Sequence, residues 1–163
     1  MIELRLQNIN DAESFFNILN NPNFIHFGVK PNSIDDEIVW LKQNSKRQKE
    51  NSEWNYTILY NGNIVGAIGV KINYHRKYIG EIGYFLDEKY WNKGIITQAV
   101  KLIEKICKNE LHLTRLEISM PVGHLASEKV AIKNHYSKEG TLKQLVKDKD
   151  GKMKDCYLYA KIL

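Results

Sequence analysis

The chain has 163 residues, of which 43% are hydrophobic and 26% are charged, as is usual for a globular protein with one hydrophobic core. No apolar run approaches the roughly 20 residues that cross a bilayer, and the N-terminal MIELRLQNIN has no signal-peptide core. We therefore expect one domain over residues 1–163, in the cytoplasm and without membrane contact.

The formal net charge is +5, with lysines concentrated in residues 45–49 and 143–154. Both runs lack the aromatic spacing of a base-stacking platform, so we interpret them as a solvated face and expect no nucleic-acid partner. Attraction for a polyanion, such as a phosphate-bearing cofactor or an acidic protein, is the alternative. Two cysteines, Cys107 and Cys156, lack metal-ligand spacing and are too few for a disulfide framework.

The N-terminal third predicts one strand and two helices. Residues 2–6 alternate apolar and polar side chains, which favours a strand. Asn10 followed by Glu13 resembles a helix N-cap with a capping box, and Pro22 ends that helix. Ser33, with three acids behind it, predicts the start of the second helix.

The middle of the chain predicts three strands and a long helix. The runs 54–60 and 63–70 flank Asn61-Gly62, a strong signal for a two-residue hairpin. A third strand follows at 79–86. From near Thr97 the apolar residues recur at helical spacing, which predicts an amphipathic helix.

The C-terminal part adds a strand at 115–120, a short helix at 125–134 and a hairpin that turns at Asp150-Gly151 and ends in the strand 156–162. The predicted order is β-α-α-β-β-β-α-β-α-β-β. Hairpins followed by a strand, a crossover helix and a strand predict a mixed sheet with helices packed on it, an α/β (α+β) fold.

The loop before the long helix is the first candidate for chemistry. Gly94, after Asn92 and Lys93, lets backbone amides turn outward, and the helix start offers unpaired N–H groups that suit phosphate. One glycine before a helix is a weak signal, since an ordinary strand–helix loop looks the same. The segment is neither a Walker A motif nor a dinucleotide fingerprint.

The chain as a whole resembles the GNAT N-acetyltransferases, and in particular their RimJ/RimL-type branch. The resemblance is carried by these motifs: Ile82-Gly83-Tyr84-Phe85-Leu86-Asp87-Glu88, Gly94-Ile95-Ile96-Thr97-Gln98-Ala99, Pro121 through Ala126-Ser127, His135-Tyr136, Glu139-Gly140, and Asp150-Gly151 with Asp155 and Tyr159. It covers nearly the whole chain and is strongest from residue 80 onward.

The resemblance implies that acetyl-CoA lies in a gap between two splayed strands, 79–86 and 115–120, and that no metal takes part. Its pyrophosphate would rest on the amides of Asn92, Lys93, Gly94, Ile95, Ile96 and Thr97. Backbone groups near Phe85 and Leu86 would pair with the pantetheine arm.

The same resemblance implies a direct attack of a neutral amine on the thioester. Glu88 would be the base and Ser127 the acid that protonates the leaving thiolate, with Glu81 as a second candidate base. A solvated loop acid is the alternative for Glu88, and an N-cap of the next helix is the alternative for Ser127.

Several positions depart from the family pattern. Asn92 replaces a second loop glycine, Ile96 replaces a small residue, and His124 replaces an asparagine. His124 either contacts the cofactor, acts as a base or is an exposed loop residue. Ala131 stands where many GNAT enzymes carry a catalytic tyrosine, so that route is absent.

The acceptor amine is not encoded in a motif. The RimL-like pattern favours a protein N-terminal α-amine, such as that of a ribosomal protein. A small amine (polyamine, amino sugar or aminoglycoside) and a non-catalytic acyl-CoA-binding sensor stay open, and the resemblance suggests a homodimer. We expect the acceptor pocket between the first two helices and the hairpin at 141–159, with these candidate lining residues: Trp40, Trp54, Tyr74 and Tyr157.

Overall fold

The computed structural model describes residues 1–25, 30–148 and 150–163. These residues form a seven-stranded sheet in the order β1-β2-β3-β4-β5-β7-β6. The strands are β1 (Ile2–Leu6), β2 (Glu53–Tyr60), β3 (Asn63–Ile72), β4 (Ile79–Leu86), β5 (Arg115–Pro121), β6 (Ser137–Lys147) and β7 (Met153–Ile162). The pair β4–β5 is parallel, and the other neighbouring pairs are antiparallel. The predicted mixed sheet with helices packed on it is confirmed, and most of its strand pairs are antiparallel.

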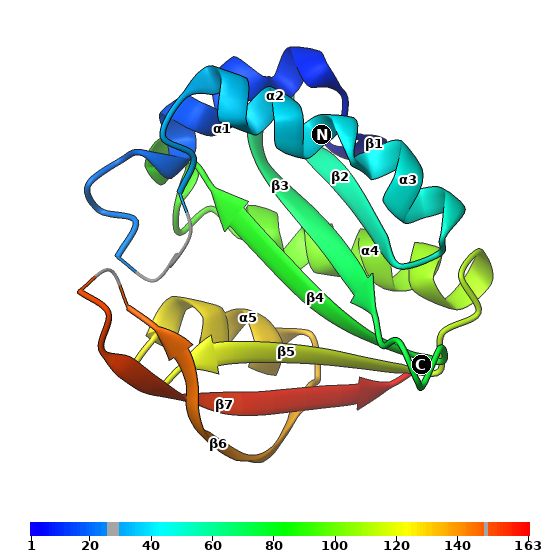
Figure 1. The fold of residues 1–163 in the computed structure, drawn as a ribbon. Coiled ribbons are helices and arrows are strands. Elements are labelled where there is room, and N and C mark those ends of the chain that lie inside the picture. The colour runs from blue at the N-terminus through cyan, green and yellow to red at the C-terminus, as the bar shows by residue number, and fades with distance from the viewer. Residues whose placement is uncertain (26–29, 149) are drawn as a thin grey trace.

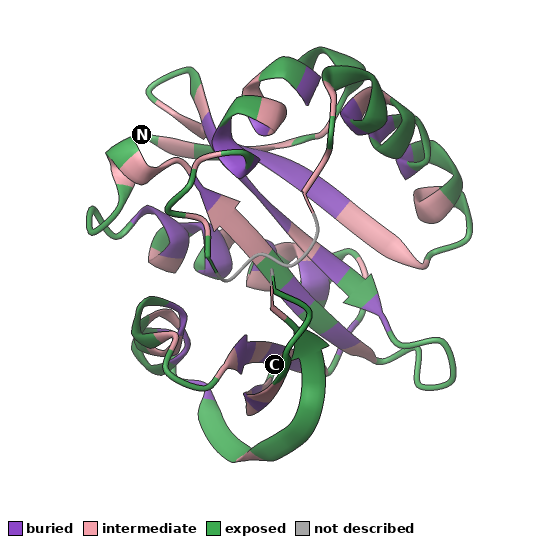
Figure 2. Ribbon diagram, turned by 60° about the vertical axis from the view of Figure 1, so that its left-hand side comes forward, coloured by how far each residue is buried: buried purple, intermediate pink, exposed green. Residues whose placement is uncertain are grey.

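Helices cover both faces of this sheet (Figure 1). On one face lie α1 (Ala12–Leu19), α2 (Ile34–Lys42) and α3 (Asn44–Lys49), and on the other lie α4 (Ile95–Asn109) and α5 (Leu125–Lys133). Two short 3-10 helices, η1 (Ile9–Asp11) and η2 (Glu88–Tyr90), precede α1 and α4. Figure 2 shows that burial is concentrated in the central strands, whereas β6 is exposed along almost its whole length.

The main core lies between the sheet and α4. The apolar stripe of α4 is buried as the spacing predicts, from Ile95 through Ala99 and Ile103 to Cys107. The helix begins at Ile95, two residues earlier than expected, because Gly94 adopts a left-handed conformation (φ 74°) and serves as its N-cap. No helix in the described ranges is long and apolar enough to span a membrane.

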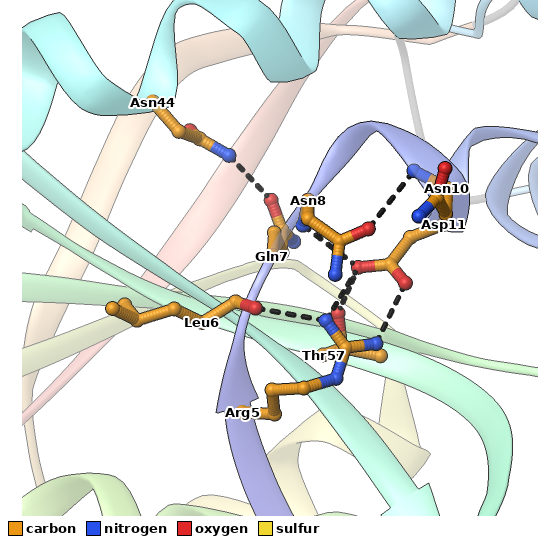
Figure 3. A network of polar contacts seen from close by, with 8 residues as sticks. All are labelled: Arg5, Leu6, Gln7, Asn8, Asn10, Asp11, Asn44 and Thr57. Carbon is orange, nitrogen blue, oxygen red and sulfur yellow. Dashed lines mark hydrogen bonds and ion pairs between the residues drawn. The ribbon is translucent and has the colours of Figure 1, made fainter.

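The first turn of the N-terminal helical segment differs from the prediction. Asn8, not Asn10, is the capping residue: its side chain accepts a hydrogen bond from the Asn10 amide, and its own amide donates to Asp11 at 3.0 Å. Asp11 completes this capping box, as Figure 3 shows. The predicted cap at Asn10 is therefore wrong, and the capping box lies two residues earlier, at Asn8 and Asp11.

Asp11 also ties the N-terminal segment to the sheet (Figure 3). Its carboxylate is 1% exposed, forms an ion pair with Arg5 at 2.7 Å and accepts a 2.6 Å hydrogen bond from the Thr57 hydroxyl on β2. Burial alone would raise the pKa of Asp11, but the hydrogen bonds from Arg5, Thr57 and the Asn8 amide outweigh it, so the pKa is lowered. Asp11 therefore stays charged and stabilises the entry to α1.

The basic run at 45–49 forms α3, a helix that was not expected. Lys46 and Lys49 are solvated, in keeping with the prediction, but Arg47 turns inward. Its guanidinium lies 4.3 Å from the Trp40 ring centroid and 3.6 Å from the Glu53 carboxylate. Arg47 of α3 thus contacts both α2, at Trp40, and β2, at Glu53.

Both predicted hairpins are present. Asn61 and Gly62 have φ values of 50° and 81°, as a two-residue turn with left-handed residues requires. At the tip between β6 and β7, Gly151 has φ 77° and donates its amide to the Asp148 carbonyl at 3.0 Å. The last strand starts at Met153, three residues before the predicted start.

Candidate active site

The site is built around the parallel pair β4 and β5. Their ladder joins Ile79–Glu81 to Arg115–Glu117 and ends there. Beyond Glu81 and Glu117 the two strands diverge, which Figure 1 shows as a widening gap between them. The splayed pair of central strands expected from the resemblance is therefore present.

Backbone groups of β4 line one side of this gap. The Asp87 amide donates to the Val65 carbonyl of β3 at 2.8 Å, so by alternation the odd-numbered residues of β4 pair with β3. The backbone groups of Tyr84 and Leu86 then face the gap, and those of Phe85 face β3. The Leu86 carbonyl already accepts a 2.8 Å hydrogen bond from Trp91 Nε1. The geometry thus favours Tyr84 and Leu86, rather than Phe85 and Leu86, for contacts across the gap.

The loop before α4 forms a concave row of amides. Asn92 and Gly94 are both left-handed, with φ values of 60° and 74°. Within the described residues, none of the amides from Asn92 to Thr97 donates a hydrogen bond to another protein group. Such a row at a helix N-terminus attracts an anion.

The two loop departures keep this geometry. Asparagine tolerates the left-handed region better than most residues, so Asn92 adopts the conformation that a second glycine would supply. Ile95 and Ile96 are both buried in the main core, so the side chain of Ile96 does not crowd the loop surface. A Cβ added at Gly94 would meet no protein atom within 4 Å, and Lys93 is exposed beside the row.

Ser127 lies at the far side of the gap, at the start of α5. It is 6% exposed, and its Oγ lies 2.7 Å from the hydroxyl oxygen of Tyr84 on β4. Burial raises the pKa of Tyr84 to about 12, although the hydrogen bond to Ser127 opposes the shift. Ser127 is not the N-cap of α5, since His124 occupies that position.

Glu88 lies in η2, between β4 and the amide row. Its carboxylate accepts hydrogen bonds from the side-chain amides of Asn21 and Asn23, both at 2.8 Å. These contacts hold the segment after α1 against the end of β4. Glu88 is not among the residues that line the cleft described next.

A cleft of about 690 Å³ lies between the first two helices and the sheet. It reaches Glu81 and Gly83 on β4 and Ser119 on β5, so it opens onto both sides of the gap. The first two helices line this cleft, as expected for the acceptor pocket, but its other wall is the sheet, and no residue of the hairpin 141–159 lines it. Trp40 lines this cleft, and Tyr74 lines a neighbouring one of about 450 Å³.

The remaining aromatic candidates lie elsewhere. Trp54 and Tyr157 line neither cleft and pack against the main core instead. Two residues of the site were missed from the sequence: Tyr84, which contacts Ser127, and Glu37, which lines the cleft from α2. Tyr84 stands within a quoted motif next to Phe85, and strand alternation would have separated their directions. Glu37 gave no such signal, because it looked like one more first-turn acid.

Comparison with known proteins agrees with this geometry. The family model described as an acetyltransferase (GNAT) domain matches residues 2–137. The chain belongs to the GNAT acetyltransferase family.

Within this family, two curated relatives match shorter segments. A probable N-acetyltransferase of Bacillus subtilis, YjcK, is 41% identical over 66 residues, which are 40% of this chain and 36% of the relative. The ribosomal-protein-serine acetyltransferase of Escherichia coli is 37% identical over 83 residues, 51% of this chain and 46% of the relative. The matched segments therefore span less than half of either relative.

The fold of the chain is also similar to that of a solved structure. Mycobacterium smegmatis RimJ in complex with CoA-disulfide superposes with a TM-score of 0.90 at 19% identity. The match covers 99% of this chain and 81% of that one. At this identity the likeness shows the fold, and it includes the C-terminal hairpin that follows residue 137.

Proposed function

We propose that this GNAT domain transfers an acetyl group from acetyl-CoA to a primary amine. The observation that carries the proposal is the gap between β4 and β5, which has a row of unpaired amides at one end and a carboxylate-lined cleft on one face. A relative of the same fold, M. smegmatis RimJ, is described in complex with a CoA-disulfide, which supports CoA as the ligand of such a gap.

The residues present fit acetyl-CoA. The amides of residues 92–97 would hold its pyrophosphate with the help of the α4 dipole, and the exposed Lys93 would add a positive charge. The edge of β4 at Tyr84 and Leu86 offers backbone donors and acceptors for an amide-bearing arm. The open space at Gly94 leaves room for phosphate oxygens beside the backbone.

Acetyl-CoA supplies a thioester, whose carbonyl carbon is attacked by the neutral amine. The new C–N bond replaces the C–S bond, the amine loses one proton to a base, and the thiolate gains one. Ser127 and Tyr84 form the donor pair for that second proton. The pKa of Tyr84 is raised to about 12, so its phenol is protonated at neutral pH and can resupply the Ser127 hydroxyl.

For the base, the geometry favours Glu81 over Glu88. Glu81 lines the cleft at the point where β4 and β5 separate, whereas the Glu88 carboxylate is engaged by two asparagine amides outside the cleft. A base must lie within hydrogen-bond reach of the amine, directly or through one water. We also propose that His124, which precedes α5, contacts the bound acetyl-CoA.

Two acceptor classes follow from different observations. The relative named ribosomal-protein-serine acetyltransferase supports a protein N-terminal α-amine. The carboxylates of the cleft, above all the buried Glu37, support a small cationic amine.

The test is release of CoA thiol from acetyl-CoA in the presence of an amine panel. The panel contains alkyl diamines, amino sugars and peptides with free N-terminal serine or alanine, and the N-acetyl product is identified by mass. Acetylation of at least one class well above hydrolysis supports the proposal. Tight acetyl-CoA binding with no acetylation of any amine would favour the non-catalytic sensor instead.

A further inference from the structure

Glu37 is the one acid of the α2 first turn that points into the fold. It is 7% exposed, while its neighbours Asp35 and Asp36 are exposed. It stands one turn before Leu41, which packs against Phe15 and Ala67 on the same side of the helix. Glu37 therefore forms part of the wall of the 690 Å³ cleft, opposite the sheet.

Within the described residues, the Glu37 carboxylate makes no hydrogen bond and no ion pair. Burial raises its pKa, and no neighbouring donor offsets this shift. Burying an unpaired carboxylate is costly, and such groups normally have a charged or hydrogen-bonding partner. Lys30 and Lys71 line the same cleft, but no ion pair joins either of them to Glu37, and burial alone accounts for the shift in its pKa.

The cleft around Glu37 is acidic, although the chain as a whole is basic. The described residues that line it include four acids and two lysines. Glu53 lies 3.6 Å from the Arg47 guanidinium and accepts a 2.9 Å hydrogen bond from the Asn55 side-chain amide. Asp36 Oδ2 accepts a hydrogen bond from the Asn32 amide. Of these four acids only Glu37 is buried, and in the described part of the chain its carboxylate has no partner.

The floor of the cleft admits a slim ligand. Gly69 and Gly83 are paired across β3 and β4, between the apolar pair Ala67–Phe85 and the charged pair Lys71–Glu81. A Cβ at Gly83 would meet no atom within 4 Å, so the space above it is open. The Asn55 side chain fills the corresponding space at Gly69, so an unbranched chain can lie over Gly83, between the sheet and the wall formed by α2.

We propose that Glu37 binds a second, non-reacting positive charge of the acceptor, so that the preferred acceptor is a linear diamine or a similar small dication. This inference rests on the proposed acetyl transfer. One ammonium pairs with Glu37 on the wall of the cleft, and the other, after losing its proton, faces the gap near Glu81. Glu37 is then a specificity residue and takes no part in proton transfer.

The test compares 1,5-diaminopentane with 1-aminopentane, which has the same chain and one charge fewer. The wild type should favour the diamine at least tenfold in kcat/KM. Glu37→Gln should raise the KM for the diamine at least tenfold, leave kcat within twofold and leave the KM for the monoamine unchanged. Asp35→Asn, which removes an exposed acid from the same turn, should change neither substrate.

Two results would overturn the inference. One is a wild type that does not distinguish the two amines, which requires no variant. The other is an equal effect of Glu37→Gln on both amines, or a loss in kcat with a shifted pH profile, since that would make Glu37 a base or a structural residue.

A binding measurement separates this inference from the proposed function. Calorimetric titration of 1,5-diaminopentane into the CoA-bound protein should show binding at least tenfold weaker for Glu37→Gln. This result supports the Glu37 site even if no amine is acetylated. Acetylation with unaltered diamine binding would leave the proposed function standing and remove the role of Glu37. Acetyl-CoA affinity should be equal in both proteins.

Discussion

The hydroxyl oxygens of Tyr84 and Ser127 lie 2.7 Å apart, one on β4 and the other on α5. This contact joins the two sides of the gap where the ladder between β4 and β5 has ended. Tyrosine and serine hydroxyls can each donate and accept, so the pair can pass a proton along its length. We propose that this pair protonates the leaving thiolate, since Ala131 stands where many GNAT enzymes carry a tyrosine.

Ser127→Ala should lower kcat at least tenfold, because the leaving thiolate would lose its proposed proton donor, and positioned acids contribute about 100-fold or more. Tyr84→Phe should have a smaller effect, since it removes only the second donor. Acetyl-CoA affinity, measured by calorimetry, should be nearly unchanged in both. Wild-type turnover in both variants would exclude this pair from proton transfer.

The two candidate bases can be separated by a pair of isosteric changes. Glu81→Gln should lower kcat at least tenfold and remove the acid limb of its pH profile, because the base would no longer titrate. Glu88→Gln should leave that limb in place, since it alters contacts with Asn21 and Asn23 outside the cleft. A lost acid limb in Glu88→Gln instead would restore the role that the resemblance implies for Glu88.

Gly94→Val should abolish acetyl-CoA binding, because a β-branched residue cannot adopt φ 74° without strain and its side chain would occupy the open space beside the amides. Gly151→Val is the matched control, because Gly151 has a similar φ of 77° at the tip of the β6–β7 hairpin. This substitution should destabilise the protein without weakening acetyl-CoA binding. Normal acetyl-CoA affinity in Gly94→Val would contradict the assignment of this loop.

Asp11→Asn should destabilise the protein by about 2 kcal/mol at neutral pH, the value of hydrogen bonds that involve a charged group. The pKa of Asp11 is lowered in the folded protein, so its contribution is complete above the unfolded pKa of about 4. It is lost as the pH falls below 4 towards the folded pKa. Urea unfolding at several pH values checks this. The difference between wild type and variant should shrink in acid, and a constant difference would show that charge is not involved.

Much of the fold could be predicted from local signals. Asn61-Gly62, the period of α4 and the alternation of β1 each depend on a few adjacent residues. The misplaced cap at Asn10 shows the limit of such signals, since Asn8 and Asn10 both suit a cap, and the choice depends on Asp11 reaching Arg5 and Thr57. Helix α3 was missed because Arg47 packs on Trp40, a contact that composition does not reveal.

The site was predicted less completely for the same reason. Ser127 and the amides of residues 92–97 lie on elements that local patterns predict, and their roles stay predictions. Glu37 could not be distinguished from Asp35 and Asp36, because only the packing of α2 on the sheet decides which acid is buried. Glu81 and Glu88 differ likewise in their tertiary partners, not in their local sequence.

The most direct test of the account is calorimetric titration of acetyl-CoA into the purified protein, with desulfo-CoA as a control that lacks the thioester. The amide row and the gap predict that acetyl-CoA binds in the micromolar range, about 8 kcal/mol. Desulfo-CoA should still bind, because the same amides hold its phosphates, but somewhat less tightly, because it lacks the acetyl-thioester. No binding at millimolar acetyl-CoA would contradict the account, and the gap between β4 and β5 would then be a feature of the fold without its ligand.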